Sequence, residues 1–440
     1  MFSNRDLRRM IVPLLLEQLL VLLVGIADTF MISYAGEAAV SGVSLVNSFS
    51  TVFIYLFAAL ASGGAVVVSQ YIGARRPESA GEASGQLLMI SSLFSLAVSA
   101  LILITGDGLL LLLFGRVETD VMEACRIYLR ISALSYPALA VYNTGGALYR
   151  SQGDTKTTMV ISVIANIVNV VGNYIGVFVL HAGVAGVAWP TFFSRVLSAA
   201  AITALACRKD QTLHYEGRYV LRWNGALLKK ILRIAVPNGA EGAIFQLVKV
   251  ALSSIVALFG TYQIAANGVA QSIWSLAAIV GTAMGPVFIT VIGQCMGAGD
   301  TEQADFYFRK LLGVSLIAAV AWNGLVLAGT PLLLRFYQLS QETRNLIFRL
   351  VLIHNIFNAT AFTVSNLSSG LRAAGDIRFT MLVSIGATLL VRLVFSWLFA
   401  LKLGGGVIGI AWAMVLNWIA TAVIFALRVK SGKWKACRVV

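Results

Sequence analysis

Residues 11–33 have the sequence IVPLLLEQLLVLLVGIADTFMIS, and this stretch decides the fold class of the chain. A helix that crosses the hydrocarbon core of a bilayer needs about 20 mostly apolar residues. The run is long enough, and Glu17 and Asp28 are its only ionisable side chains. Three arginines precede it, but it is longer than the apolar core of a signal peptide and no small-residue cleavage site follows. We therefore expect a retained first membrane helix.

The rest of the chain continues this pattern. Its 440 residues are 58% hydrophobic and only 12% charged, whereas soluble domains carry about 25% charged residues, so a water-soluble enzyme is excluded. Apolar runs lie at about 11–33, 45–71, 87–114, 123–149, 157–180, 184–206, 227–258, 268–292, 310–334, 344–370, 379–402 and 407–427. We predict an all-α polytopic membrane protein with twelve transmembrane helices and no domain outside the membrane.

The charge distribution predicts the orientation of the chain. The formal net charge is +14, but the basic residues lie between apolar runs and form no patch with interleaved aromatics, so we expect no nucleic-acid partner. With the N-terminus inside, the external loops carry only Arg116, Arg335, Arg344 and Lys402. By the positive-inside rule both termini are cytoplasmic. The four cysteines form no CxxC pattern, so no metal or redox motif is expected.

The two halves of the chain repeat each other at an offset of 224 residues, which becomes 222 and then 223 farther along. Matched pairs include Val12/Val236, Pro13/Pro237, Glu17/Glu241, Val24/Val248, Gly36/Gly260, Gln70/Gln294, Arg150/Arg372, Thr158/Thr380, Gly186/Gly409 and Trp189/Trp412. Six spans separate equivalent points, so both copies have the same orientation and a pseudo-two-fold axis along the membrane normal relates them. We expect six-helix lobes at 1–206 and 231–440 around a central cavity, joined by a basic cytoplasmic linker at 207–230.

This repeat favours a transporter over a channel, because two lobes that rock about a shared midplane site expose it alternately to either side. The sequence contains no GxxxxGK[ST], HExxH or GxSxG motif. It also shows no convergent nucleophile and base for an intramembrane enzyme. We therefore expect a protein that is not an enzyme, has no cofactor, and takes its energy from an ion gradient.

Asp28 is the strongest candidate for a coupling residue. A charge inside a span costs about 2.5–3.5 kcal/mol on insertion scales, and the small neighbours Gly25 and Thr29 let other groups approach. A carboxylate there must pair, bind a cation or hold a proton. The alternative is a static ion pair, for example with Arg195. Glu17 lies three helical turns earlier on nearly the same face, closer to the cytoplasm.

Polar residues of the fifth and sixth runs offer further oxygen atoms. Asn166, Asn169 and Asn173 have i, i+3, i+7 spacing and therefore share one helix face. Thr191 adds a hydroxyl beside a proline. Carboxylate, amide and hydroxyl oxygens suit a hard cation such as sodium, but interhelical hydrogen bonding explains the asparagines about as well.

The second half places different charges in its spans. Glu241 follows Pro237, and Lys249 lies about 12 Å farther along the same helix, too far for a direct pair. Lys249 could be neutral, pair with another carboxylate or meet an anionic substrate group. Arg392 needs a partner that the sequence does not identify. We assign Glu17, Asn166, Glu241 and Lys249 to the substrate cavity.

Several segments together resemble the multidrug and toxic compound extrusion (MATE) family over essentially the whole chain. They are Val12-Pro13, GIADTFM at 25–31, Gly36 with Ala39, Gln70 with Gly73-Ala74, LYRSQGD at 148–154 and GVAGVAW at 183–189. The resemblance implies twelve helices in two bundles, a V-shaped cavity, and export of amphipathic, often cationic compounds by proton or sodium antiport.

The resemblance also implies roles for individual residues. Asp28 matches the carboxylate that couples ion to substrate. Asn169, Asn173, Thr191 and Tyr128 match the first-lobe cation site of DinF-like members, so a sodium ion could bind at Asp28, Asn169, Asn173 and Thr191. The position of Asn173 is often Asp in that branch, which weakens the case for tight sodium binding. The second-lobe acids of NorM-like members are not matched either, because the tenth span offers His354, Asn355 and Asn358. Proton coupling is therefore preferred.

Three rival functions are considered. A flippase for a lipid-linked saccharide, of the same superfold, is favoured by the cations Lys249, Arg195 and Arg392. A membrane receptor or sensor would be favoured if Asp28 were salt-bridged and no cavity opened between the lobes. A major-facilitator-type carrier shares the parallel repeat but pairs its helices differently. For the protein itself we expect a monomer in the cell membrane, with a small-molecule substrate and the lipid bilayer as partners.

Overall fold

The computed structural model describes residues 2–115, 117–208, 215–336, 340–437 and 439–440, and their secondary structure is entirely helical. Arg116 and residues 209–214 of the expected linker lie outside this part. From the N-terminus the helices are α1 (Asn4–Ser33), α2 (Glu37–Gly73), α3 (Pro77–Phe114), α4 (Thr119–Ser151), α5 (Thr155–Tyr174), η1 (Ile175–Val179), α6 (Ala185–Ala206), α7 (Gly217–Leu221) and α8 (Gly225–Val256). They continue as η2 (Ala257–Phe259), α9 (Thr261–Ala277), α10 (Ile279–Gly297), α11 (Thr301–Leu333), η3 (Leu334–Phe336), α12 (Gln341–Ala374), α13 (Ile377–Gly386), η4 (Ala387–Leu393), α14 (Val394–Trp397), η5 (Leu398–Lys402), α15 (Gly406–Lys430) and η6 (Lys433–Ala436).

Length and composition confirm an all-helical, multi-pass membrane protein. In the described residues, 11 helices are long and apolar enough to cross a membrane. Large apolar side chains point outward from them: Ile104 is 82% exposed, Leu112 80% and Ile317 74%. A water-soluble protein would bury most such side chains, whereas a lipid-facing surface favours them.

Two of the predicted runs differ from these 11 helices. The run at 123–149 lies in α4, which is not among them; charged residues occupy its first half and polar residues such as Tyr142 and Asn143 its second. The run at 268–292 is divided at Ala278 into α9 and α10. Apolar composition did not show this division, because the chain is apolar on both sides of Ala278.

The chain forms two compact units, Ser3–Gly239 (the first unit) and Ala240–Val440 with Met1–Phe2 (the second unit). The division falls inside α8, after the expected linker at 207–230. The described part of that linker packs on α3: Gln86 Nε2 donates to the carbonyl oxygens of Tyr219 and Arg222, at 2.6 Å each. Each unit has its own apolar core, around Tyr136 in the first and around Leu350 in the second.

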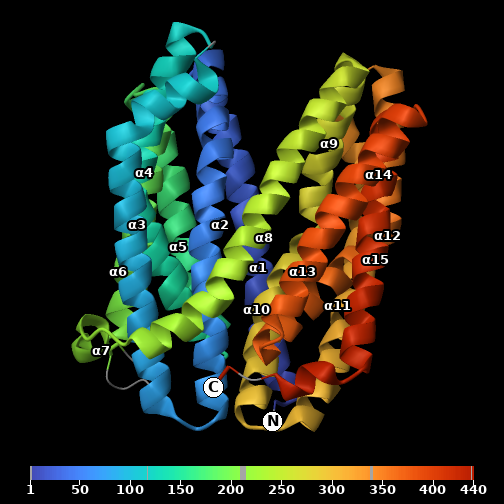
Figure 1. Cartoon of the computed structure of the whole chain (residues 1–440). Coiled ribbons are helices and arrows are strands. Elements are labelled where there is room, and N and C mark those ends of the chain that lie inside the picture. Colours follow the sequence, from blue (N-terminus) through green and yellow to red (C-terminus); the bar gives the residue numbers. More distant parts are fainter. Residues whose placement is uncertain (1, 116, 209–214, 337–339, 438) are drawn as a thin grey trace. The chain divides into compact units, whose positions relative to one another are not determined.

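Each unit is built around one helix, and the two central helices are equivalent in the repeat. In the first unit α4 packs against α2, α3 and α6, and α1 and α6 both pack on α5. In the second unit α12 packs against α9, α10, α11 and α15. Thr119, where α4 begins, and Gln341, where α12 begins, differ by the repeat offset of 222. Figure 1 shows the first unit in blue to green and most of the second in yellow to red.

Wide helical turns also recur in both units. The π-helices η1 and η5 begin at Ile175 and Leu398, an offset of 223. Beside each one a glycine of the next helix touches its backbone: a Cβ on Gly186 would lie 2.6 Å from the Gly176 oxygen, and a Cβ on Gly409 would lie 2.6 Å from the Phe399 carbonyl carbon. The π-helix η4 at Ala387–Leu393 interrupts the helix that corresponds to α5. Because a π-turn holds one residue more than an α-turn, η4 accounts for the change in offset from 222 to 223.

Candidate functional site

Four of the predicted coupling residues form a hydrogen-bonded chain across α1, α5 and α6. Asn173 Nδ2 donates to Asp28 Oδ1 at 2.6 Å and to Asn169 Oδ1 at 3.3 Å. Asn169 Nδ2 donates to Thr191 Oγ1 at 3.1 Å. The i, i+4 spacing of the two asparagines aligns them on α5, which packs between α1 and α6. The structure therefore brings these four residues together.

Asp28 also faces a cavity of about 140 Å³ in the first unit. We call this cavity the acidic pocket; it is lined by Gly25, Asp28, Thr29, Ile32, Val40, Val43, Ser44, Asn47, Tyr128 and Val187. Asp28 is its only carboxylate. Asn173 is fully buried, and its Oδ1 atom has no hydrogen-bond partner among the described residues. Carboxylate and amide oxygens are hard ligands, so the chemistry of this site suits a proton or a small cation.

Three other predicted residues of the first unit lie apart from this pocket. Asn166 Nδ2 donates to Ser162 Oγ at 3.4 Å. The buried Glu17 accepts from the hydroxyls of Tyr142 and Thr158, at 3.4 Å each. Arg195 donates to Ser135 Oγ at 2.7 Å, and the structure records no ion pair between it and Asp28. The static pair that would favour a sensor is therefore not observed.

The second unit separates its two candidate substrate residues. Glu241 on α8 accepts from Arg372 Nη2 on α12 at 2.7 and 2.8 Å, which makes a well-formed ion pair. It lines a cavity of about 230 Å³ together with Phe245, Trp274 and Asn358. Lys249 lines a different cavity of about 70 Å³. Glu241 and Lys249 are therefore not members of one site.

The pocket at Lys249 contains two cationic residues and a histidine. We call it the basic pocket; it is lined by Lys249, Leu252, Ser253, Val256, Asn267, Gln271, His354, Arg392, Ile410, Ala411 and Met414. None of these is an acid. The sequence did not identify this group as a pocket, although one signal was available: adding 224 to Gly25 and Asn47 of the acidic pocket gives Lys249 and Gln271.

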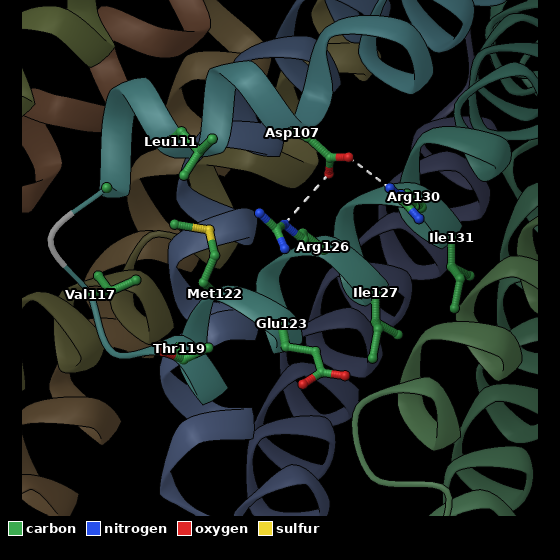
Figure 2. Close-up of a pocket in the computed structure, with 11 residues that line it drawn as sticks. Asp107, Leu111, Val117, Thr119, Met122, Glu123, Arg126, Ile127, Arg130 and Ile131 are labelled. Atoms are coloured by element: carbon green, nitrogen blue, oxygen red, sulfur yellow. Dashed lines mark hydrogen bonds and ion pairs between the residues drawn. The ribbon is translucent and has the colours of Figure 1, made fainter.

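Arginines in the first half of α4 have a different role. Arg130 Nη2 lies 2.7 Å from Asp107 Oδ2, and Arg126 Nε lies 3.7 Å from Asp107 Oδ1. Figure 2 shows both arginines facing Asp107 across a surface pocket. That pocket has a volume of about 630 Å³. The three side chains are 43–62% exposed, and ion pairs of this kind add little to stability. We regard them as surface contacts of a helix end.

Comparisons with known proteins extend over almost the whole chain. A family model described as MatE matches residues 13–175 and 237–398, two segments whose starts differ by the repeat offset. The uncharacterized transporter YisQ of Bacillus subtilis is 26% identical over 430 residues, 96% of this chain and 93% of the relative. The probable multidrug resistance protein NorM of Thermotoga maritima is 22% identical over 439 residues, 98% of this chain and 93% of the relative.

A solved structure has the same fold. It is the outward-facing conformation of a multidrug resistance MATE family transporter of the MOP superfamily, with a TM-score of 0.91 and 20% identity over 98% of this chain and 96% of the other. At this identity the likeness shows the fold alone. Because the family model matches well over half of the residues, the chain belongs to the MatE family of multi-pass membrane transporters and is not an enzyme.

Proposed function

We propose that this transporter is an antiporter that exports amphipathic, cationic small molecules, driven by the entry of protons or sodium ions. The observation that carries the proposal is the environment of Asp28. Its carboxylate lies within a membrane helix, faces a cavity, and is bonded to the neutral amide of Asn173. A carboxylate held this way can gain and lose a small cation, which a permanent arginine partner would prevent. The name of the NorM relative, a probable multidrug resistance protein, supports drugs as cargo.

We favour the proton as the coupling ion. Asp28 is the single carboxylate of the acidic pocket, and Asn173 turns a donor, its Nδ2 group, toward it. Sodium is the alternative, with oxygen ligands from Asp28, Asn169, Asn173 and Thr191, and Tyr128 lines the same pocket.

The wider arrangement follows from the same proposal. We propose twelve spans, with α4 as the span beyond the 11 apolar helices, in six-helix lobes at 1–206 and 231–440 related by an axis along the membrane normal. Both termini are placed in the cytoplasm of a cell-membrane monomer, because the loops on that side carry most of the basic residues. The set at Asp28, Asn169, Asn173 and Thr191 favours the DinF-like branch.

The test is efflux of ethidium, an amphipathic cation, from proteoliposomes on which pH and sodium gradients are imposed separately. We expect the wild type to respond to the pH gradient, and Asp28→Asn to remain at the level of protein-free liposomes. Asp107→Asn is the matched control, because this acid of the same unit lies outside the acidic pocket. Normal efflux by Asp28→Asn under both gradients would show that the coupling role is wrong.

A second function is favoured by one observation, the cationic lining of the basic pocket. A flippase for a lipid-linked saccharide or another anionic lipid precursor would use such a surface to hold phosphate. Translocation of a short-chain polyprenyl pyrophosphate across liposomes, with no ethidium efflux in the same preparation, would favour this function over antiport.

A further inference from the structure

The acidic and basic pockets occupy equivalent positions in the repeat. Each lies within its own unit. The equivalent lining residues are Gly25/Lys249, Asp28/Leu252, Thr29/Ser253, Ile32/Val256, Val43/Asn267 and Asn47/Gln271 at an offset of 224, and Val187/Ile410 at 223. At that last offset Asn169 and Thr191, from the Asp28 chain, correspond to Arg392 and Met414 of the basic pocket. Duplication has therefore preserved one cavity in two copies.

The charges of the two copies are opposite. The only acid of the first pocket, Asp28, is replaced by Leu252 in the second. Gly25 is replaced by Lys249, and Asn169 by Arg392. The acidic pocket thus carries one carboxylate, and its counterpart carries a guanidinium and an ammonium group with His354 beside them.

Arg392 has no anionic partner in the described part of the chain. It is only 8% exposed. Its guanidinium lies 4.8 Å from the ring centre of Phe245 and donates to Met414 Sδ at 3.4 Å, and neither of these groups carries a charge. Its Nε atom has no hydrogen-bond partner in that part. An aromatic face and a thioether stabilise a cation weakly compared with a carboxylate. A buried arginine in such surroundings is short of an anion.

His354 is left in the same state. It is 3% exposed, and neither Nδ1 nor Nε2 has a hydrogen-bond partner among the described residues. The acid Glu241 lines another cavity and is already bonded to Arg372. Arg392 Nε and both ring nitrogens of His354 are therefore buried without partners in the described residues, and the two side chains line a single pocket. This points to a ligand supplied from outside the chain.

The size of the pocket limits that ligand. Its volume is about 70 Å³, whereas a single water needs about 10–15 Å³ on the same scale. A carboxylate or one phosphate group fits, and a whole drug-sized molecule does not. Apolar side chains complete the lining, among them Leu252, Val256 and Ile410, and they suit an alkyl tail on the bound group.

We propose that the basic pocket binds the anionic headgroup, a carboxylate or a phosphate, of an amphipathic molecule, with Arg392, Lys249 and His354 as its donors. This site is separate from the Asp28 site and goes beyond the proposed antiport. The headgroup can belong to a soluble amphiphile or to a lipid of the bilayer, and the same chemistry would bind either.

Equilibrium dialysis of radiolabelled decanoate against the full chain in dodecyl maltoside tests the proposal, with empty micelles as the blank. Decanol and decyltrimethylammonium are matched probes without the anion. We expect decanoate to bind and decanol not to bind above the blank. Arg392→Gln should weaken decanoate binding about 10–100-fold, because a hydrogen bond to a charged group contributes about 1.5–3 kcal/mol.

Two further variants keep the test decisive if Arg392→Gln folds poorly. Lys249→Met changes an exposed side chain and should weaken binding several-fold. Arg349→Gln removes an exposed arginine of α12, the helix that carries His354, and should bind as the wild type does. Equal decanoate binding by the wild type, Lys249→Met and Arg392→Gln would overturn the proposal, as would decanol binding as tightly as decanoate.

Lipid competition identifies the source of the headgroup. If the wild type retains phosphatidylglycerol in preference to phosphatidylcholine, and Arg392→Gln loses this preference, the headgroup belongs to a lipid. Decanoate binding without any lipid preference assigns it to a soluble amphiphile, and both results support the site. The binding assays use no ion gradient. If the proposed antiport failed in liposomes, decanoate binding to the basic pocket could therefore still be observed.

Discussion

The acidic pocket and the basic pocket have the same helical frame and opposite charge. Helices related by the repeat surround each one, and six lining positions correspond at the single offset of 224. Differences at the positions of Asp28, Gly25 and Asn169 separate a pocket that carries a carboxylate from one that carries two cations and no acid. The fold therefore supplies the cavity, whereas a few side chains set its chemistry.

A second pair of equivalent positions shows the same divergence. Glu17 and Glu241 differ by 224 in number, and both lie on the first long helix of their repeat. Glu17 accepts two long bonds from hydroxyl groups, whereas Glu241 forms a short ion pair with Arg372. Equivalent acids therefore have different neighbours, and their replacement should have different costs.

The largest expected effect comes from returning the missing acid to the basic pocket. Leu252→Asp places a carboxylate at the counterpart of Asp28, beside Lys249 and Arg392. This internal anion should satisfy both cations, so decanoate binding should be lost. Leu252→Asn has the same shape without the charge and should still bind decanoate. If both variants bind decanoate equally in the dialysis assay, the pocket does not act through its charge.

The next effect concerns the glycines that touch the π-helices. Gly186→Ala and Gly409→Ala add a methyl group 2.6 Å from backbone atoms, so each should destabilise its own unit by about 3 kcal/mol. Gly313→Ala on α11 has open space around it and is the control. Thermal unfolding in detergent, followed by tryptophan fluorescence, measures the shift. Equal melting temperatures for all three variants would mean that the backbone shifts to accommodate the added methyl group at little cost in stability.

A smaller effect is expected from the two equivalent glutamates. Glu241→Gln leaves the half-buried Arg372 without its ion pair and should cost about 2 kcal/mol. Glu17→Gln should cost less than half of that, because the bonds it loses are long. Thermal unfolding of the two variants side by side makes the measurement. A larger loss of thermal stability in Glu17→Gln than in Glu241→Gln would contradict the view that Glu241 has the stronger partner.

The smallest effect sharpens the choice of coupling ion. Asn173→Asp puts a second carboxylate against Asp28, and two close carboxylates favour a shared proton or a bound cation. We expect ethidium efflux to become several-fold more sensitive to sodium, with Asn345→Asp at an exposed position of α12 as the control. If Asn173→Asp shows the same sodium dependence of efflux as the wild type, the coupling cation does not bind between residues 28 and 173.

Much of the fold could be predicted from the sequence, because its signals are local or repetitive. Long apolar runs predicted the helices, and the 224-residue offset predicted two related halves. The spacing of Asn169 and Asn173 placed both on one face, and the structure brings that face to Asp28 and Thr191. The resemblance to the MATE family pointed to the same four residues.

Other features could not be predicted, because they depend on how the helices are rotated and packed. Arg372 lies 131 residues from Glu241, and no periodic pattern indicates their ion pair. His354 belongs to the basic pocket only because α12 turns that face toward α15, where its ring lies 6.1 Å from that of Trp418. The division of α9 from α10 falls inside a continuous apolar run, without a proline or a charged residue at Ala278 to mark it.

Proton release on cargo binding tests the central claim, that Asp28 exchanges a small cation for cargo, most directly. Tetraphenylphosphonium is added to the purified chain in weakly buffered detergent containing a pH-sensitive dye, with and without sodium. The account predicts that the wild type releases protons as the cation binds, and that Asp28→Asn binds with no release. Equal proton release by the wild type and Asp28→Asn would contradict it.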